Sequence, residues 1–295
     1  MIARGKGPWP RGNDESSVKQ WFISRISSGI EDSEHLPLAR LCLGHVSDMT
    51  RGERIVADYK FPESELDKLA VIADEILNGR PIQYVLGKTV FCGLDMFIAE
   101  GALIPRPETE ELVHRVCSEI EEGFQGRIID VGTGSGCIAL ALKDANPMSD
   151  VIGLDVSEDA LKIAKQNGQN LGLGVEFTQL DILNERPNSS FNIVVSNPPY
   201  ILESERDSME IRVKDFEPNI ALFVDCDPLL FYTRIVSLCC EGLLIPGGLL
   251  ALECNRAYAS DVAKLIDDSH CLENAVIIED LQGRERHVIA RSKVN

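Results

Sequence analysis

The chain has 295 residues, 44% of them apolar, and a formal net charge of −18 at pH 7. This length predicts one large domain or two of ordinary size, and no apolar run approaches the ~20 residues of a membrane span or follows the N-terminus as in a signal peptide. Residues 1–60 carry nine Lys/Arg and eight Asp/Glu, so the remainder has a balance of −19, which argues against binding to nucleic acid. We expect a cytoplasmic protein.

Apolar side chains at helical spacing predict a small helical bundle at residues 16–85, after a loose tail at residues 1–15. The pattern begins after a start signal at Asp14 and ends before Gly79 and Pro81. Residues 51–60 are polar, and their pattern predicts no particular element. The apolar groups are Val18, Trp21, Phe22, Ile26 and Ile30; Leu36, Leu38, Leu41 and Leu43; and Leu66, Leu69, Ala70, Ala73, Ile76 and Leu77.

A hairpin-like connector is predicted at residues 86–106, where apolar residues are broken by Gly93 and Gly101. Strands and helices then alternate through residues 107–295, which predicts an α/β fold with a doubly wound, Rossmann-like parallel sheet. The two final strands follow one another without a helix, so one of them is expected to be antiparallel at the edge. The predicted strands are 127–131, 150–155, 174–179, 191–196, 247–254, 275–281 and 286–291; the predicted helices are 135–145, 157–172, 229–243 and 256–268.

The nine cysteines form no C-x-x-C pair and are odd in number. This pattern argues against a disulfide framework and against a zinc ribbon, and several of them are expected to pack in the core. The five histidines are dispersed without ligand spacing, so we expect no metal site.

The ends of the first three predicted strands carry a candidate nucleoside site, because ligands bind at the carboxyl ends of such strands. The first strand leads into a glycine-rich turn at residues 132–136, and Asp155, nineteen residues past Gly136, ends the second strand where an acid can hold a ribose. Asp181 and Ile182 follow the third. The G-x-G-x-G spacing differs from the dinucleotide fingerprint, and a nucleoside without a pyrophosphate fits it better. S-adenosylmethionine is such a ligand.

The fourth of these strands ends in Asn197-Pro198-Pro199-Tyr200. A simple rigid turn is one interpretation, because neither proline can continue a ladder. At a nucleoside site, a clamp for a planar amide or amino group is favoured. The Asn197 side-chain oxygen and the Pro198 carbonyl can each accept one N–H of that group, and Tyr200 offers a ring face for stacking.

These residues and further segments resemble the bacterial HemK/PrmC family, the protein-(glutamine-N5) methyltransferases of peptide chain release factors. The similarity runs from about residue 18 to 292. Its segments are 80–87 (RPIQYVLG), 91–113 (FCGLDMFIAEGALIPRPETEELV), 130–142 (DVGTGSGCIALAL), 196–201 (SNPPYI), 217–222 (EPNIAL) and 280–291 (DLQGRERHVIAR).

The resemblance implies that residues 16–85 dock the release factor and that residues 107–295 form a class I methyltransferase domain that uses S-adenosylmethionine. The acceptor would be the glutamine of the Gly-Gly-Gln loop. Arg106 and Glu108 would lie near the site. Together the two arguments give these expected cofactor contacts: Gly132, Thr133, Gly134, Ser135, Gly136, Asp155, Asp181, Ile182 and Asn197. The expected substrate contacts are Asn197, Pro198, Pro199 and Tyr200, of which Asn197, Pro198 and Tyr200 are the expected catalytic residues.

The chain departs from the family in two places, Glu253-Cys254-Asn255 in place of Glu-x-Gly and residues 224–228, where the family has glycines. Three alternatives are open: a ribosomal-protein glutamine as acceptor, adenine N6 of a nucleic acid, and a non-catalytic adaptor that binds S-adenosylmethionine. The charge balance argues against the second, and the clamp argues against the third. We expect a monomer whose partner is the protein substrate, without a membrane or nucleic-acid partner.

Overall fold

Two units make up the chain in the computed structural model, Met1–Gly87 and Lys88–Asn295. The structure describes residues 7–209 and 211–294. Each unit has its own hydrophobic core. In the described part of the chain, no helix is both long and apolar enough to cross a membrane.

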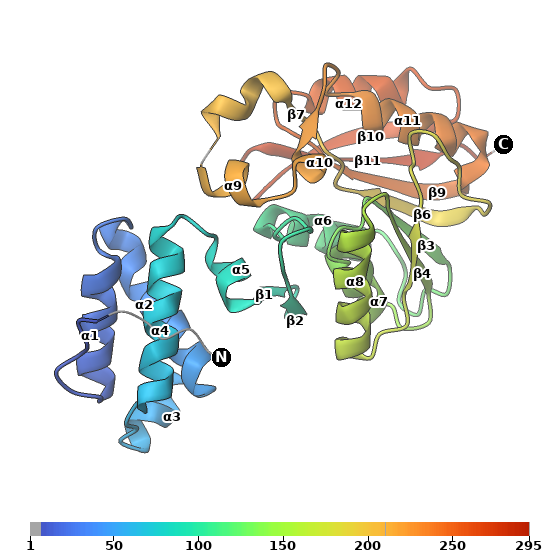
Figure 1. Cartoon of the computed structure of the whole chain (residues 1–295). Helices are drawn as coiled ribbons and strands as arrows, with labels where there is room; N and C mark the ends of the chain where they lie inside the picture. Colours follow the sequence, from blue (N-terminus) through green and yellow to red (C-terminus); the bar gives the residue numbers. More distant parts are fainter. Residues whose placement is uncertain (1–6, 210, 295) are drawn as a thin grey trace. The chain divides into compact units, whose positions relative to one another are not determined.

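The described residues of the first unit form five helices (Figure 1). Their core contains most of the apolar residues that the sequence placed at helical spacing, with Val18 and Phe22 fully buried. Leu36 and Leu41 of the second group are exposed instead. Phe61, between two helices, is buried with them. The helices are α1 (Glu15–Ile26), α2 (Asp32–Ser47), α3 (Arg51–Val56), α4 (Glu63–Leu77) and α5 (Ile82–Leu86).

Helix α3 lies in the polar segment for which the sequence predicted no element. Thr50 and Glu53 form a capping box that starts it. Arg54 is only 1% exposed, and its Nε donates to the Glu15 carboxylate at 2.8 Å. Because the buried side chain of this helix is an arginine, an apolar pattern could not reveal it.

Residues 7–14 were expected to belong to a loose tail, and they contact helix α1. Trp21 Nε1 donates to the Pro8 carbonyl at 2.7 Å, and the Trp9 and Trp21 ring centroids are 6.2 Å apart. Asp14 caps the helix by accepting from the backbone of Ser16 and Ser17. Residues 1–6 of the expected tail lie outside the described residues.

The second unit contains a hairpin followed by a seven-stranded sheet. The sheet order is β10-β11-β9-β6-β3-β4-β5, and the five strands from β9 to β5 are mutually parallel. The hairpin strands are β1 (Lys88–Phe91) and β2 (Leu94–Phe97); the sheet strands are β3 (Arg127–Val131), β4 (Asp150–Asp155), β5 (Glu176–Gln179), β6 (Phe191–Ser196), β9 (Leu244–Glu253), β10 (Leu272–Glu279) and β11 (Glu285–Ser292).

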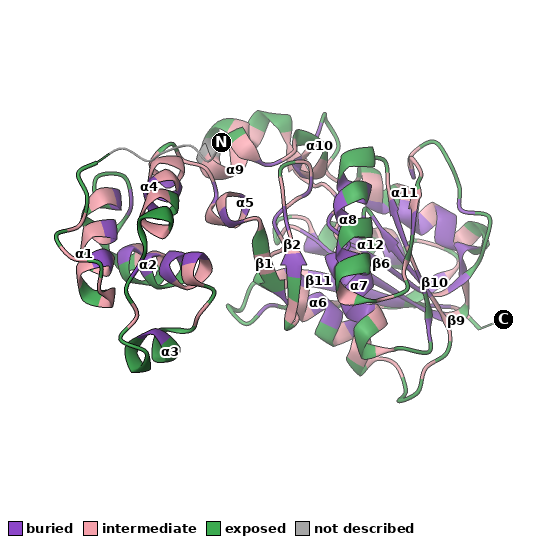
Figure 2. Cartoon of the chain, turned by 60° about the horizontal axis from the view of Figure 1, so that its bottom comes forward, coloured by how far each residue is buried: buried purple, intermediate pink, exposed green. Residues whose placement is uncertain are grey.

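Helices cover both faces of this sheet, and the buried residues of its strands lie between the two layers of helices (Figure 2). Alternate strand residues serve opposite faces. Ile128 and Val195 pack in the core under α6 (Pro107–Ser118), α7 (Cys137–Ala145) and α8 (Glu158–Leu171). Ile129 and Val194 pack in the core under α11 (Leu230–Leu238) and α12 (Ala259–Asp267).

The predicted position of the antiparallel strand is wrong. Strand β11 is antiparallel, but it lies between β9 and β10, and β10 forms the edge. The short turn at residues 280–284 makes β11 return alongside β10. It thereby fills the place beside β9, to which it also pairs.

Two further features were not predicted. Short elements separate β6 from α11: β7 (Ile201–Leu202), η1 (Glu203–Ser208), α9 (Ile211–Phe216), α10 (Asn219–Leu222) and β8 (Phe223–Val224). Cys240 and Cys271 form a disulfide, against the expectation from cysteine spacing. Cys240 lies in η2 (Cys239–Leu243), and Cys271 immediately precedes β10. Their pairing depends on tertiary proximity across 31 residues, which spacing does not encode.

Candidate functional site

Strands β3, β4, β6 and β9 end at one level of the sheet. In the strand register, Val131 pairs with both Leu154 and Ser196, and Ser196 pairs with Leu252. The next residue of each strand is therefore Gly132, Asp155, Asn197 or Glu253. The order of strands reverses between β3 and β6, so this edge is also the switch point at which ligands bind in such sheets.

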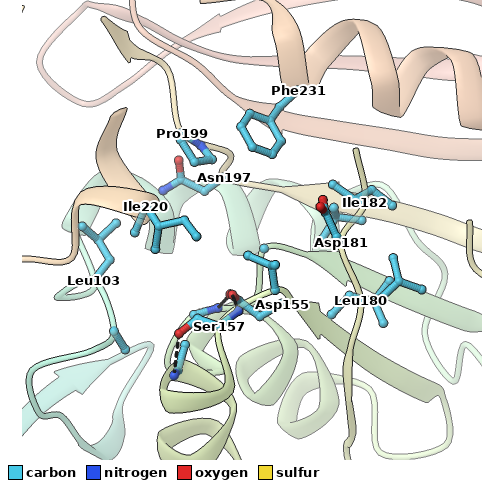
Figure 3. A pocket seen from close by; sticks show the side chains of 18 of the residues that line it. Leu103, Asp155, Ser157, Leu180, Asp181, Ile182, Asn197, Pro199, Ile220 and Phe231 are labelled. Carbon is cyan, nitrogen blue, oxygen red and sulfur yellow. Dashed lines mark hydrogen bonds between the residues drawn. The ribbon is translucent and has the colours of Figure 1, made fainter. Parts of the chain in front are cut away.

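A cavity opens at this edge (Figure 3). Its walls come from the ends of β3, β4, β5 and β6 and from two segments outside the sheet, residues 101–103 and 220–221. Figure 3 shows Asp155 and Asp181 on one side of the space and Asn197 and Leu103 on the other. The lining residues are Gly101, Ala102, Leu103, Val131, Gly132, Gly134, Leu154, Asp155, Val156, Ser157, Ala160, Leu180, Asp181, Ile182, Leu183, Asn197, Pro199, Ile220, Ala221 and Phe231.

The glycine-rich turn gives the cavity its floor. Gly132 and Gly134 have φ angles of 75° and 55°, and a Cβ at either would meet no atom within 4 Å. A ligand can therefore approach this backbone closely. The other turn residues do not line the cavity. Thr133 donates its hydroxyl to buried Asp130 at 2.6 Å, while Ser135 is buried and Gly136 is enclosed by side chains.

Asp155 is held in place by backbone donors. Its two carboxylate oxygens accept from the N–H groups of Gly134 and Ser157, both at 2.8 Å. Burial raises its pKa, and these hydrogen bonds oppose the rise. A carboxylate has about four acceptor positions, so both oxygens retain capacity for the hydroxyls of a ribose.

Asp181 and Ile182, which follow β5, form another part of the cavity wall. The Asp181 carboxylate accepts from the backbone of Leu183 and the amide of Asn184. Ile182 is 6% exposed, and its carbonyl accepts from Arg234 of α11. Apart from Asp181, the side chains at this wall are apolar. Such a wall suits a flat heterocyclic ring that packs on the apolar side chains beside the Asp181 carboxylate, a hydrogen-bond acceptor.

The tetrapeptide at residues 197–200 lies between this cavity and a second one. Asn197 and Pro199 line both, while Pro198 and Tyr200 line only the second. Burial raises the pKa of Tyr200 to about 12, so its hydroxyl is neutral at physiological pH. The second cavity is lined by Leu103, Arg106, Asn197, Pro198, Pro199, Tyr200, Ile201, Met209, Val213, Ala221, Leu222 and Glu253.

Polar residues that the sequence analysis did not select also belong to this site. Asn197 Nδ2 donates to Thr109 Oγ1 at 3.2 Å, and Thr109 Oγ1 donates to Glu253 Oε2 at 2.7 Å. The pKa of Glu253 is raised to about 7, chiefly by burial. Thr109 lies inside the segment resembling the family motif, and no spacing rule connects it with Glu253, 144 residues away.

Arg106, expected near the site, lines the second cavity and forms an ion pair with Glu217. Glu108 does not line either cavity. Its backbone carbonyl contacts the ring of buried His287 at 2.9 Å, which joins the first turn of α6 to β11.

The sheet order and the cavity at the β3–β6 switch point define a class I methyltransferase, the class that uses S-adenosylmethionine. Residues 109–213 match the family model of the methyltransferase small domain. The fold is similar to that of a methyltransferase from Pyrococcus furiosus, with a TM-score of 0.51, 16% identity and coverage of 75% of this chain and 98% of that one.

Curated relatives define the family within this class. The chain is 42% identical to the release factor glutamine methyltransferase of Bacteroides thetaiotaomicron over 76% of this chain and 80% of the relative. It is 33% identical to that of Flavobacterium psychrophilum over 90% and 95%, respectively. The chain belongs to the release factor glutamine methyltransferase family.

Proposed function

We propose that this chain transfers a methyl group from S-adenosylmethionine to the side-chain amide nitrogen of the glutamine in the Gly-Gly-Gln loop of bacterial peptide chain release factors. One observation carries the proposal for the site. Two cavities adjoin at Asn197 and Pro199, one bounded by the glycine turn and Asp155, the other by the rest of the tetrapeptide. A donor and an acceptor can thus meet at one amide side chain.

The first cavity would hold the cofactor. Gly132 and Gly134 leave room for its methionine part, Asp155 would bind the ribose hydroxyls, and Asp181 with Ile182 would face the adenine. When bound, S-adenosylmethionine supplies an electrophilic methyl group on a sulfonium. Thr133, Ser135 and Gly136 would support the turn from beneath rather than contact the ligand.

The second cavity would hold the glutamine amide. An amide nitrogen is a poor nucleophile because its lone pair is delocalised into the carbonyl. The Asn197 Oδ1 and the Pro198 carbonyl would accept its two N–H bonds, and the Tyr200 ring would cover its plane. Holding the nitrogen in one orientation provides much of the rate in such a reaction. No strong base is needed, since the proton leaves after the nitrogen has gained its methyl group.

We also propose the division of labour between the units. Residues 16–85 would dock the release factor, residues 86–106 would connect the helical domain to the methyltransferase domain, and residues 107–295 would carry out the methyl transfer. The protein would act as a monomer. The described residues of the first unit contain no candidate chemistry, and a docking role would explain why this unit accompanies the methyltransferase domain. The charge balance of −19 after residue 60 favours a protein over a nucleic acid as substrate.

The test is methyl transfer from labelled S-adenosylmethionine to purified release factor. A release factor with Gln→Ala in its Gly-Gly-Gln loop is the control, and the label is located by mass spectrometry. We expect label on the wild-type glutamine alone. Equal labelling of both proteins would place the acceptor elsewhere in the release factor. If neither release factor is labelled but ribosomal protein or RNA added to the same assay is labelled, the proposed substrate is wrong.

A further inference from the structure

Three buried or half-buried side chains form a hydrogen-bonded row across the sheet edge. Asn197 Nδ2 donates to Thr109 Oγ1 at 3.2 Å, and Thr109 Oγ1 donates to Glu253 Oε2 at 2.7 Å. Thr109 and Glu253 are each 2% exposed. Asn197 directly follows strand β6 and Glu253 ends the neighbouring strand β9, while Thr109 reaches them from the first turn of α6.

With Glu253 ionised, the row has one internally consistent pattern of donors. An ionised carboxylate can only accept, so the single hydroxyl hydrogen of Thr109 is directed to Glu253. The Thr109 oxygen then has only lone pairs to offer to Asn197. The –NH₂ side of the Asn197 amide must therefore face Thr109, and its carbonyl oxygen must face away, toward the two cavities.

We propose that Thr109 and Glu253 are positioning residues that fix which way the Asn197 amide faces, and thereby present its oxygen to the acceptor glutamine. This inference rests on the proposed function, in which Asn197 Oδ1 accepts an N–H of that glutamine. With the Asn197 amide reversed, its –NH₂ group would meet the donors of the glutamine amide. Two donors cannot bond to each other, so the acceptor nitrogen would lose one of its two fixed bonds.

The variants that test this are Thr109→Val and Thr109→Ser. Valine keeps the shape of the side chain but removes the hydroxyl, while serine keeps the hydroxyl. We expect Thr109→Val to lower kcat about 10-fold, which corresponds to one lost hydrogen bond. S-adenosylmethionine affinity should stay within about 2-fold of wild type, since the loss of one remote hydroxyl leaves the cofactor wall intact. Thr109→Ser should restore most of kcat.

Thermal unfolding of both variants separates positioning from mere structural support. Loss of kcat in Thr109→Val at a melting temperature equal to that of Thr109→Ser supports the inference. Wild-type kcat in Thr109→Val overturns it. So does an equal loss in the two variants, because the hydroxyl would then not be the group that matters.

A second readout needs no turnover. In ¹⁵N-labelled protein, the side-chain –NH₂ signals of Asn197, assigned by their loss in Asn197→Asp, report whether its nitrogen is hydrogen-bonded. We expect slow exchange with water in the wild type and Thr109→Ser, and fast exchange in Thr109→Val. Equal exchange in all three proteins overturns the inference. This readout applies even if no release factor is methylated and the proposed function fails. If the wild type methylates the release factor and Thr109→Val keeps wild-type kcat and slow exchange, the proposed function stands and the positioning role falls.

Discussion

Arg106 and Glu217 form an ion pair that joins the segment before α6 to the segment before α10. The Glu217 carboxylate is 4% exposed, and its second oxygen accepts from the backbone N–H of Ile104 at 3.2 Å. One buried carboxylate thus holds both segments outside the sheet that line the two cavities, one with Leu103 and the other with Ala221.

Replacing Glu217 with alanine should loosen both cavities at once. The change leaves the Ile104 N–H and the Arg106 guanidinium without an acceptor, at a cost of about 2 kcal/mol. We expect S-adenosylmethionine affinity and kcat/KM for the release factor to fall together, each about 10-fold, by calorimetry and labelled-methyl assay. The matched control is Glu203→Ala, which breaks the exposed pair with Arg206. Equal effects of the two substitutions would contradict the anchoring role.

Asn197→Ala should separate binding from turnover. The side chain is one of many on the cofactor cavity, but in the proposed mechanism it holds one N–H of the reacting amide. We expect kcat to fall on the order of 100-fold, with cofactor affinity within about 3-fold of wild type by calorimetry, since no cofactor charge depends on it. Unchanged turnover in this variant would rule out the clamp.

Asp155→Asn should give the opposite result. It removes a charge and one acceptor from the residue proposed to bind the ribose, and it weakens the bond to the Gly134 N–H. We expect cofactor affinity to fall at least about 10-fold, with kcat near wild type once cofactor is saturating. Asp159→Asn, at an exposed position of α8, serves as the control. A normal affinity in Asp155→Asn would remove the ribose role.

The raised pKa of Glu253, about 7, predicts opposite effects of pH on activity and stability. The ionised form orients Thr109, so kcat should fall as the pH drops below about 7. A carboxyl whose pKa is higher in the folded state stabilises the fold at low pH, and that contribution is lost as the pH rises through about 7. The charged and titratable groups facing Glu253 are Arg106, Glu108, Tyr200, Tyr232, Arg286 and His287.

Glu253→Gln removes this carboxyl and leaves its titratable neighbours in place. We expect the acid limb of the kcat profile near pH 7 to disappear in Glu253→Gln. The melting temperature at pH 8 should rise relative to wild type, and the difference should shrink at pH 5. A limb that persists in the variant would assign it to another group, such as His287.

The Cys240–Cys271 disulfide should contribute to stability by closing a loop across 31 residues. Chain-entropy arguments give about 4 kcal/mol for a loop of this size. We expect reductant, or Cys271→Ser, to lower the free energy of unfolding by that amount, which is measured through a lower midpoint of denaturant unfolding. Cys226→Ser, at an exposed free cysteine, should leave the midpoint unchanged. Identical midpoints with and without reductant would show that the bond adds nothing.

Sequence patterns could predict the parts of this molecule in which local rules act. The strand ends at Val131, Asp155 and Ser196 are each marked by an apolar run followed by a glycine, an acid or a proline pair, so the edge of the sheet was predictable. The place of β11 was not, because the direction and neighbour of a terminal strand depend on the connection before it.

The row from Asn197 to Glu253 was also beyond local rules. Thr109, Asn197 and Glu253 come from three distant segments. The tetrapeptide marked Asn197, but Thr109 and Glu253 taken alone resemble ordinary residues of their elements. Helix α3 was not predicted from the sequence for a related reason. Its buried face is provided by Arg54, whose charge is paired with Glu15 of another helix and whose guanidinium also donates to Ser47 and the Met49 carbonyl.

The common level of the strand ends makes strand length a functional quantity. A single residue inserted into or deleted from β6 would shift Asn197 by about 3.3 Å along the strand and turn its side chain to the opposite face. The same holds for β9 and Glu253. We therefore expect variation in this enzyme to consist of substitutions within these strands and of length changes in the connections at their opposite ends. An added residue in such a connection leaves Asn197 and Glu253 at the same level of the sheet and within reach of Thr109.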